Sequence, residues 1–158
     1  MSRAFVKEID DASLPSVERP VSTAPNLVTP RGAQLIEKSV ATLEEQLAAT
    51  PDEEAASVLR RDLRYWVARR ASMRIVTPNV APNAIGFGVR ATIRRGALTS
   101  DISIVGEDEA DPTAGLIAWT APLARALDGA EPGDIVDLEA GGRLEPILVV
   151  AATAGGVE

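Results

Sequence analysis

The sequence predicts an α+β protein, in which an N-terminal antiparallel helical hairpin is followed by a β-rich domain. Between residues 30 and 74, apolar side chains recur every three or four positions, which is the period of helices packed along one face. After residue 84 the apolar runs become short and are separated by turns that contain glycine or proline, which is typical of strands. The composition of the 158 residues, 46% hydrophobic and 25% charged, is that of a soluble globular protein.

Residues 1–28 are rich in proline and show no sustained apolar period, so we expect an extended or disordered arm. Within this arm, segment 2–8 could dock as a short strand or helix. A helix is predicted to begin at Thr29-Pro30, because threonine is a good N-cap and proline fits the first helical position. The apolar positions that follow are spaced by four, three and four: Ile36, Val40, Leu43 and Leu47.

A second helix start follows at once, where Thr50, Pro51 and Glu53 form a capping-box pattern. Two helices joined by so short a connection are expected to fold back as a hairpin over residues 29–76. Its buried seam is predicted to contain Leu43, Leu47, Leu59, Leu63 and Trp66. Arg70 falls on this seam, and Tyr65 beside it is left free for a contact.

Residues 77–83 form a proline-containing linker, residues 84–150 the β-rich domain and residues 151–158 a small-residue tail that we expect to be frayed. A short helix is predicted at 122–127. Strands are predicted near 85–94, 100–106, 116–120, 134–139 and 143–150.

The absence of cysteine and histidine excludes disulfides, zinc fingers, thiol nucleophiles and Ser-His-Asp triads. We therefore expect no enzymatic activity of the chain's own, no cofactor and no resident metal. The net charge of −7 argues against unaided binding to duplex DNA. No apolar run reaches the length of about 18 residues that a membrane span needs, and the N-terminus is acidic rather than signal-like, so we expect a cytoplasmic protein without a membrane partner.

Four strings of the chain closely resemble the bacterial Gre (GreA/GreB) family of transcript-cleavage and elongation factors. They are VTPRG at 28–32, IVGEDEAD at 104–111, GLIAWTAPLARAL at 115–127 and PGDIV at 132–136. The resemblance implies an antiparallel coiled coil and a C-terminal domain of FKBP-like fold. It further implies docking of the C-terminal domain at the secondary channel of RNA polymerase, with the hairpin entering that channel.

The tip of the hairpin departs from the family pattern. Each arm is shorter than the family's usual arm by about ten residues, or about 15 Å of helix. The family's Gly-Asp-x-x-Glu-Asn string, whose acids help to hold a catalytic Mg²⁺ in the polymerase, is absent. The tip acids are Asp52, Glu53 and Glu54. They are either Mg²⁺ contacts in trans or ordinary first-turn acids that favour the helix N-terminus.

The second arm carries six arginines: Arg60, Arg61, Arg64, Arg69, Arg70 and Arg74. The basic face of Arg60, Arg61 and Arg64 could lie along RNA or an acidic channel wall. The alternative is a solvated face paired with Glu37, Glu44 and Glu45 across the hairpin.

In the β-rich domain, Ala121-Pro122-Leu123-Ala124-Arg125 resembles the family's docking loop, Ser-Pro-x-Ala-Arg. The resemblance therefore assigns polymerase docking to Pro122 and Arg125. The first serine is replaced by alanine, which removes one hydroxyl contact. Gly106, Gly133 and the acidic turn 107–111 are also compatible with simple packing and turn roles.

The expected function is a monomeric factor that binds RNA polymerase and modulates elongation, with contact to nascent RNA or DNA only inside that complex. Stimulation of transcript cleavage is doubtful because the hairpin is short. One alternative is a cleavage-incompetent polymerase binder resembling the nucleoside diphosphate kinase regulator. The other is an FKBP-like prolyl isomerase, although only Phe87 and Trp119 could supply an aromatic pocket.

Overall fold

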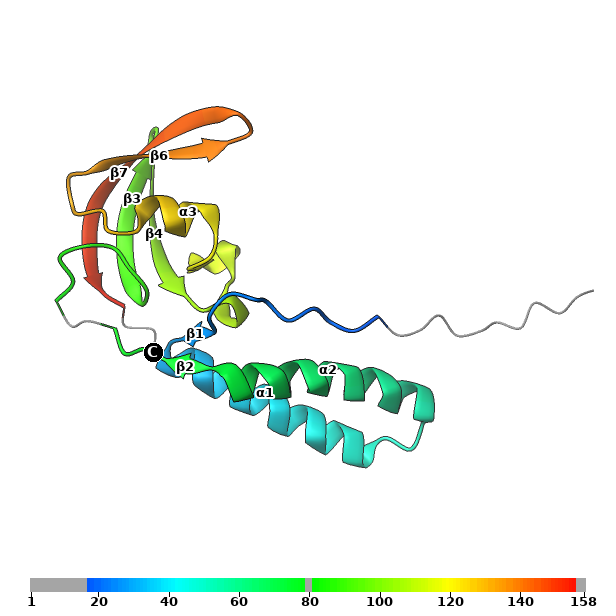
Figure 1. Cartoon of the computed structure of the whole chain (residues 1–158). Helices are drawn as coiled ribbons and strands as arrows, with labels where there is room; N and C mark the ends of the chain where they lie inside the picture. The colour runs from blue at the N-terminus through cyan, green and yellow to red at the C-terminus, as the bar shows by residue number, and fades with distance from the viewer. Residues whose placement is uncertain (1–16, 79–80, 156–158) are drawn as a thin grey trace, which may run out of the picture.

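The computed structural model describes residues 17–78 and 81–155. Segment 2–8 and the end of the tail therefore lie outside the described residues. A helical hairpin is followed by a curled β-domain, which confirms the predicted α+β architecture (Figure 1). The elements in chain order are β1 (Leu27–Val28), α1 (Pro30–Ala49), α2 (Glu53–Ser72), β2 (Arg74–Ile75), β3 (Val89–Arg95), β4 (Leu98–Val105), η1 (Glu107–Glu109), η2 (Pro112–Ala114), β5 (Leu116–Ala118), α3 (Pro122–Leu127), β6 (Ile135–Ala140) and β7 (Arg143–Ala154).

The open end of the hairpin is closed by a two-stranded parallel sheet. Strand β1 enters α1 and strand β2 leaves α2, and Leu27 and Val28 pair with Arg74 and Ile75. The last residues of the expected N-terminal arm are therefore not extended freely, because backbone pairing and the burial of Val28 fix them at the hairpin base. Thr29 caps α1 as predicted, its hydroxyl accepting the backbone N–H of Gly32 at 3.0 Å.

The predicted capping box at the tip is wrong. Thr50 ends α1, since its backbone N–H bonds to the Leu47 carbonyl at 3.3 Å and its hydroxyl donates to the Gln46 carbonyl at 2.6 Å. Asp52 is the cap of α2 instead, accepting the Ala55 N–H at 2.8 Å. Aspartate in this position also places its negative charge at the positive end of the helix dipole.

Burial along the hairpin is concentrated at its base. Ile36 is fully enclosed near the base and Val40 is buried midway along α1, whereas nearer the tip only the small side chain of Ala56 is buried among the described residues. The predicted seam of Leu43, Leu47, Leu59, Leu63 and Trp66 is only half-buried, which corrects the expectation of full burial. Two helices alone can cover only one side of each apolar stripe, whereas near the base β1 and η1 add a further layer.

The β-domain is a five-stranded sheet in the order β5-β4-β3-β7-β6, antiparallel except for the β4–β5 pair. The short helix α3, at the residues where a helix was predicted, packs against one face of it (Figure 1). Ala124 and Leu127 of α3 meet sheet residues such as Ile93 and Ile147 in the main core. The last strand continues to Ala154, so the start of the expected frayed tail is ordered.

That extension has a packing cause. After a bulge opposite Thr92 and Ile93, Ala151, Ala152 and Thr153 continue the ladder along β3. Ala152 packs against the main core, so a small-residue run that looks uninformative in isolation is fixed by its neighbour.

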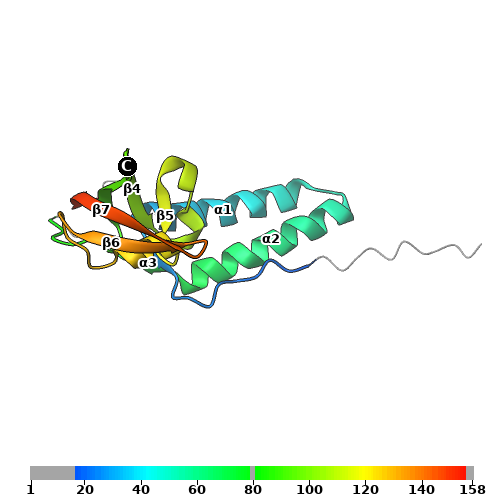
Figure 2. The same ribbon diagram turned by 90° about the horizontal axis from the view of Figure 1, so that it is seen from above.

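The hairpin projects to one side of the β-domain, and the segment before β1 runs beside α2 in both views (Figures 1 and 2). Each arm has 20 residues, which corresponds to about 30 Å of helix. Within the described ranges, no helix has the length and apolar character needed to cross a membrane.

We expect the base of the hairpin to dominate its stability. Replacing Ile36 with Ala should lower the free energy of unfolding by about 2–4 kcal/mol, because a fully enclosed side chain leaves a cavity. Leu63→Ala serves as the matched variant on the half-buried seam and should cost only about 1 kcal/mol. Urea unfolding followed by circular dichroism measures both. Equal losses would contradict a core concentrated at the base.

Candidate functional site

The tip acids predicted as metal contacts do not converge. Asp52 is occupied by its capping bond, and Glu53 pairs with Arg60 at 2.7 Å, an interaction that lowers the pKa of the Glu53 carboxyl. Glu54 is exposed on the first turn of α2. Across the ranges 17–78 and 81–155, no three acidic side chains gather in a way that could hold a metal ion. A role of these acids at the polymerase metal stays a prediction.

Each arginine of the predicted basic face already has an acidic partner. Arg60 pairs with Glu53, Arg61 with Asp62 at 3.3 Å, and Arg64 with Glu18 from the segment before the hairpin.

The expected partners across the hairpin are largely not the ones used. Of Glu37, Glu44 and Glu45, Glu37 forms an ion pair, and its partner is Arg70 at 3.7 Å. Arg70 therefore lies half-buried at the seam edge, while its neighbour Arg69 is the arginine that is enclosed.

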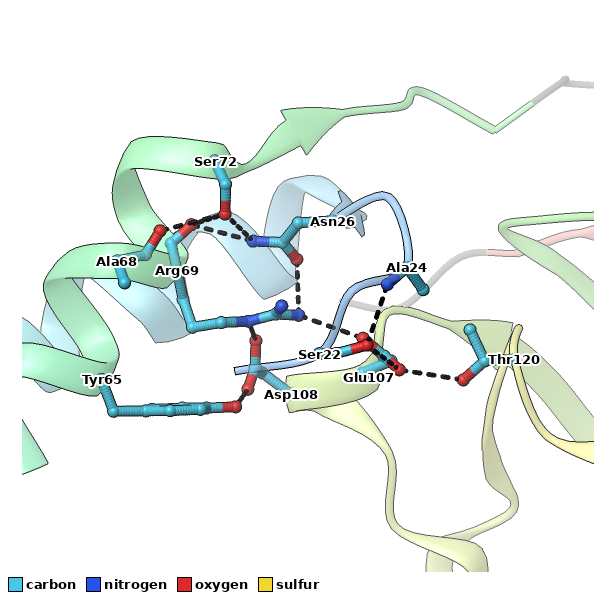
Figure 3. A network of polar contacts seen from close by, with 10 residues as sticks. All are labelled: Ser22, Ala24, Asn26, Tyr65, Ala68, Arg69, Ser72, Glu107, Asp108 and Thr120. Carbon is cyan, nitrogen blue, oxygen red and sulfur yellow. Dashed lines mark hydrogen bonds and ion pairs between the residues drawn. The ribbon is translucent and has the colours of Figure 1, made fainter. Parts of the chain in front are cut away.

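Arg69 lies at the centre of a polar network that joins three parts of the chain (Figure 3). Only 1% of its surface is exposed. Its Nε donates to Asp108 at 2.5 Å, and its Nη2 donates to the Asn26 side-chain oxygen at 2.7 Å and to Glu107 at 3.4 Å. The guanidinium thus connects α2, the segment before β1 and η1 of the β-domain.

Asn26 and Tyr65 complete this network. The Asn26 amide nitrogen donates to the Arg69 carbonyl at 2.8 Å, which fixes the turn of α2 that carries the arginine. The Tyr65 hydroxyl donates to the second oxygen of Asp108 at 2.5 Å. Tyr65 is therefore buried at the junction, and Trp66 is half-buried beside it, the reverse of the predicted roles.

A second contact joins α1 to the same short helix. Glu109 is buried, and its carboxylate accepts the Thr29 hydroxyl at 2.7 Å. The same Thr29 hydroxyl also caps α1, so one side chain joins the first turn of the hairpin to the β-domain. Glycine at 32 leaves room for Glu109, since a Cβ there would overlap the carboxylate.

Glu107 links the junction to the predicted docking loop. One carboxylate oxygen accepts the hydroxyl of Thr120 at 3.1 Å and that of Ser22 at 3.0 Å, and the other faces Arg69 (Figure 3). Thr120 directly precedes Ala121-Pro122, where α3 begins. Three acids of the turn 107–111, Glu107, Asp108 and Glu109, thus bind the hairpin to the β-domain, while Asp111 caps η2.

Pro122 and Arg125 are both exposed on α3. Arg125 borders a hollow of about 300 Å³ whose wall includes Phe87, Ile104 and Trp119. The two predicted docking residues therefore share one surface, while the tip acids and the basic face lie on the hairpin.

Sequence reasoning missed Arg69, Asn26, Glu107, Asp108 and Glu109 as a unit. One signal pointed toward them, because the six arginines of the second arm outnumber the three glutamates of the facing arm, Glu37, Glu44 and Glu45. Their partners lie about 40 residues away along the chain, for example Asp108 at 39 positions from Arg69, which no local pattern reveals.

The sole tyrosine of the chain makes this junction measurable. Burial, followed by the hydrogen bond to Asp108, raises the pKa of Tyr65 to about 12. Because the native pKa lies above the unfolded value of about 10, the stability that this phenol contributes is complete below pH 10 and is lost as the pH rises toward 12.

We expect absorbance at 295 nm to give a midpoint near 12 in the native protein and near 10 in urea. Asp108→Asn should move the native midpoint downward, whereas Asp128→Asn, an exposed acid beyond α3, should leave it in place. A native midpoint near 10 would show that Tyr65 is not held in this network.

Comparison with known proteins finds similarity to bacterial transcription elongation factors. Residues 80–153 match the family model of the C-terminal domain of the transcription elongation factor GreA/GreB. Transcription elongation factor GreA of Orientia tsutsugamushi is 38% identical over 93 residues, 56% of this chain and 57% of that protein. GreA of Alkalilimnicola ehrlichii is 56% identical over 39 residues, 25% of each chain. The chain thus spans between a quarter and just over half of the length of these relatives.

Among solved structures, the elongation factor GreA/GreB of Nitrosomonas europaea covers 80% of this chain and 98% of its own, with 22% identity and a TM-score of 0.40. The resemblance stated from the four sequence strings agrees with the family model and with the GreA relatives. Residues 80–153 of the chain are thus similar to the C-terminal domain of the GreA/GreB transcription elongation factors.

Proposed function

We propose that this chain binds RNA polymerase at its secondary channel and modulates elongation. The β-domain docks through Pro122 and Arg125, and the hairpin points into the channel. Both residues are exposed, and Arg125 stands beside a hollow lined by Phe87 and Trp119. An arginine next to an apolar depression is the type of side chain that dominates protein interfaces.

The connection from Thr120 through Glu107 to Arg69 is the observation that carries this proposal. Docking of the β-domain can direct the hairpin into the channel only if the β-domain and the hairpin keep a fixed orientation relative to each other. Here Thr120, two residues before α3, and Arg69 at the base of the hairpin bind the same carboxylate, so docking of the β-domain sets the direction of the hairpin.

The tip is proposed to contribute little to catalysis by the polymerase. Arms of about 30 Å end well short of the family's usual reach, and Mg²⁺ accepts oxygen ligands only at about 2.0–2.1 Å. Asp52 and Glu53 are also engaged within α2. The factor would then occupy the channel and compete with cleavage-competent relatives.

The hollow at Phe87 and Trp119 also favours the second candidate, a prolyl isomerase, since such sites bind proline against aromatic rings. We rank it lower because the wall holds only these two aromatic side chains among its described residues.

Docking can be tested with the full chain and core RNA polymerase. Arg125→Ala should weaken binding by about tenfold, the effect of losing about 1.4 kcal/mol at an interface, and Pro122→Ala should weaken it less. Arg143→Ala, which removes an exposed charge from the first residue of β7, is the matched control. Affinities come from interferometry with immobilised polymerase. Indistinguishable affinities of wild type and Arg125→Ala would remove this surface from the proposal.

Cleavage can be tested on a stalled elongation complex with 3′-labelled RNA. We expect release of short fragments at the rate of the factor-free complex, since the tip acids do not reach the metal. Rapid release that is lost in Asp52→Asn or Glu53→Gln, but kept in the exposed control Glu139→Gln, would establish the tip as a metal contact.

A further inference from the structure

Residues 17–22 cover part of α2. The Glu18 carboxylate pairs with Arg64, and its second oxygen accepts the Arg64 Nε–H at 3.2 Å. The Arg19 guanidinium lies 3.7 Å from the ring centre of Tyr65 and 5.4 Å from that of Trp66. Ser22 adds the bond to Glu107 at the junction. Figures 1 and 2 show this segment running beside the helix.

This cover is attached only by surface contacts. All residues from 17 to 22 are exposed, and Val17 is 84% exposed. Firm anchoring begins at Asn26, which is buried against Arg69. Exposed ion pairs and stacked guanidinium groups are individually weak. Residues 17–22 can therefore leave α2 while the junction stays intact.

The two side chains of the cover occupy positions that suit the two halves of a nucleotide. A carboxylate on the Arg64 guanidinium stands where a phosphate would bind, because arginine pairs with both in the same way. A flat guanidinium at 3.7 Å over the Tyr65 ring stands where a base would stack.

The surface beside residues 17–22 also combines aromatic and basic side chains. A groove of about 580 Å³ runs between the two helices and Arg19, and Trp66, Arg31 and Lys38 line it. Within the described parts of the chain, neither Arg31 nor Lys38 has an acidic partner within ion-pair distance. Aromatic rings next to cations that lack partners are typical of proteins that bind single-stranded nucleic acid.

We propose that residues 17–22 are an internal nucleotide mimic, which covers a binding face for single-stranded RNA on α2 and must be displaced before RNA can bind. The net charge of −7 keeps this binding weak. The excess of negative charge does not lie on the hairpin, since residues 29–76 contain eight basic and seven acidic residues. The proposal deepens the proposed function, since the RNA would be met inside the polymerase complex.

The direction in which one substitution changes the RNA affinity shows whether residues 17–22 cover the face or contact RNA. Loss of a cation normally weakens RNA binding, but Arg19→Ala in the full chain should strengthen it by about tenfold, because a closed cover reduces the competent fraction. Glu18→Gln should act in the same direction. Arg143→Ala makes the same charge change far from the cover and should leave the affinity unchanged or slightly lower. The probe is a labelled 12-residue oligouridine, followed by anisotropy at low salt.

Tighter binding of Arg19→Ala than of both wild type and Arg143→Ala supports the proposal. If Arg19→Ala binds oligouridine as tightly as wild type or more weakly, the proposal is wrong. It is also wrong if neither wild type nor any variant binds oligouridine at low salt. Binding of an acidic peptide in place of RNA overturns it too, since the face would then recognise protein.

Displacement can be observed directly because the chain contains no cysteine. Spin labels at Val17→Cys and Thr42→Cys should give a narrow distance distribution that broadens when oligouridine saturates the protein. An unchanged distribution at saturation contradicts displacement. Polymerase affinity measured without RNA tests docking separately, so either proposal can fail while the other stands.

Discussion

The guanidinium of Arg69 is enclosed where the hairpin, the segment before it and the β-domain meet. Removing such a charge from water costs several kcal/mol, so it persists only with a charged partner and matched hydrogen bonds. Asp108 supplies the charge at 2.5 Å and Asn26 a neutral acceptor at 2.7 Å. Loss of one partner of a buried pair costs about 3–5 kcal/mol, because the other charge is left alone. The junction therefore tolerates the loss of a single partner poorly, although apolar side chains such as Val28 and Ile36 also pack at the hairpin base.

This constraint determines how the other parts are arranged. Asp108 is fixed by Arg69 and Tyr65, and its neighbours Glu107 and Glu109 follow, because η1 is a single short turn. Glu109 then meets the cap of α1, and Glu107 meets Thr120 before α3. Gly106 allows η1 to approach β1 closely, since a Cβ there would lie 2.6 Å from the Leu27 carbonyl oxygen. Both helices of the hairpin and the loop before α3 thus contact three consecutive acids.

What the sequence predicted correctly depends on neighbours along the chain, and what it missed depends on distant ones. Thr29-Pro30 begins α1, and α3 occupies 122–127, because caps and prolines act within one turn. Periodicity identified the hairpin but not which part is buried, since Tyr65 replaces Trp66 at the junction only through its bond to Asp108, 43 positions away. The pairing of Arg64 with Glu18 spans 46 positions and was equally invisible to local patterns.

The same physical contrast separates the two ends of the hairpin. At the tip, Asp52 and Glu53 are exposed and their bonds stay within α2, so these contacts stabilise a helix end and leave the acids without a shared target. At the base, charges are enclosed, so their geometry is fixed and transmits position between domains. A hairpin whose base is enclosed in this way keeps one orientation relative to the β-domain. The surfaces at α2 and α3 differ from both ends, because each combines an exposed arginine with an aromatic side chain.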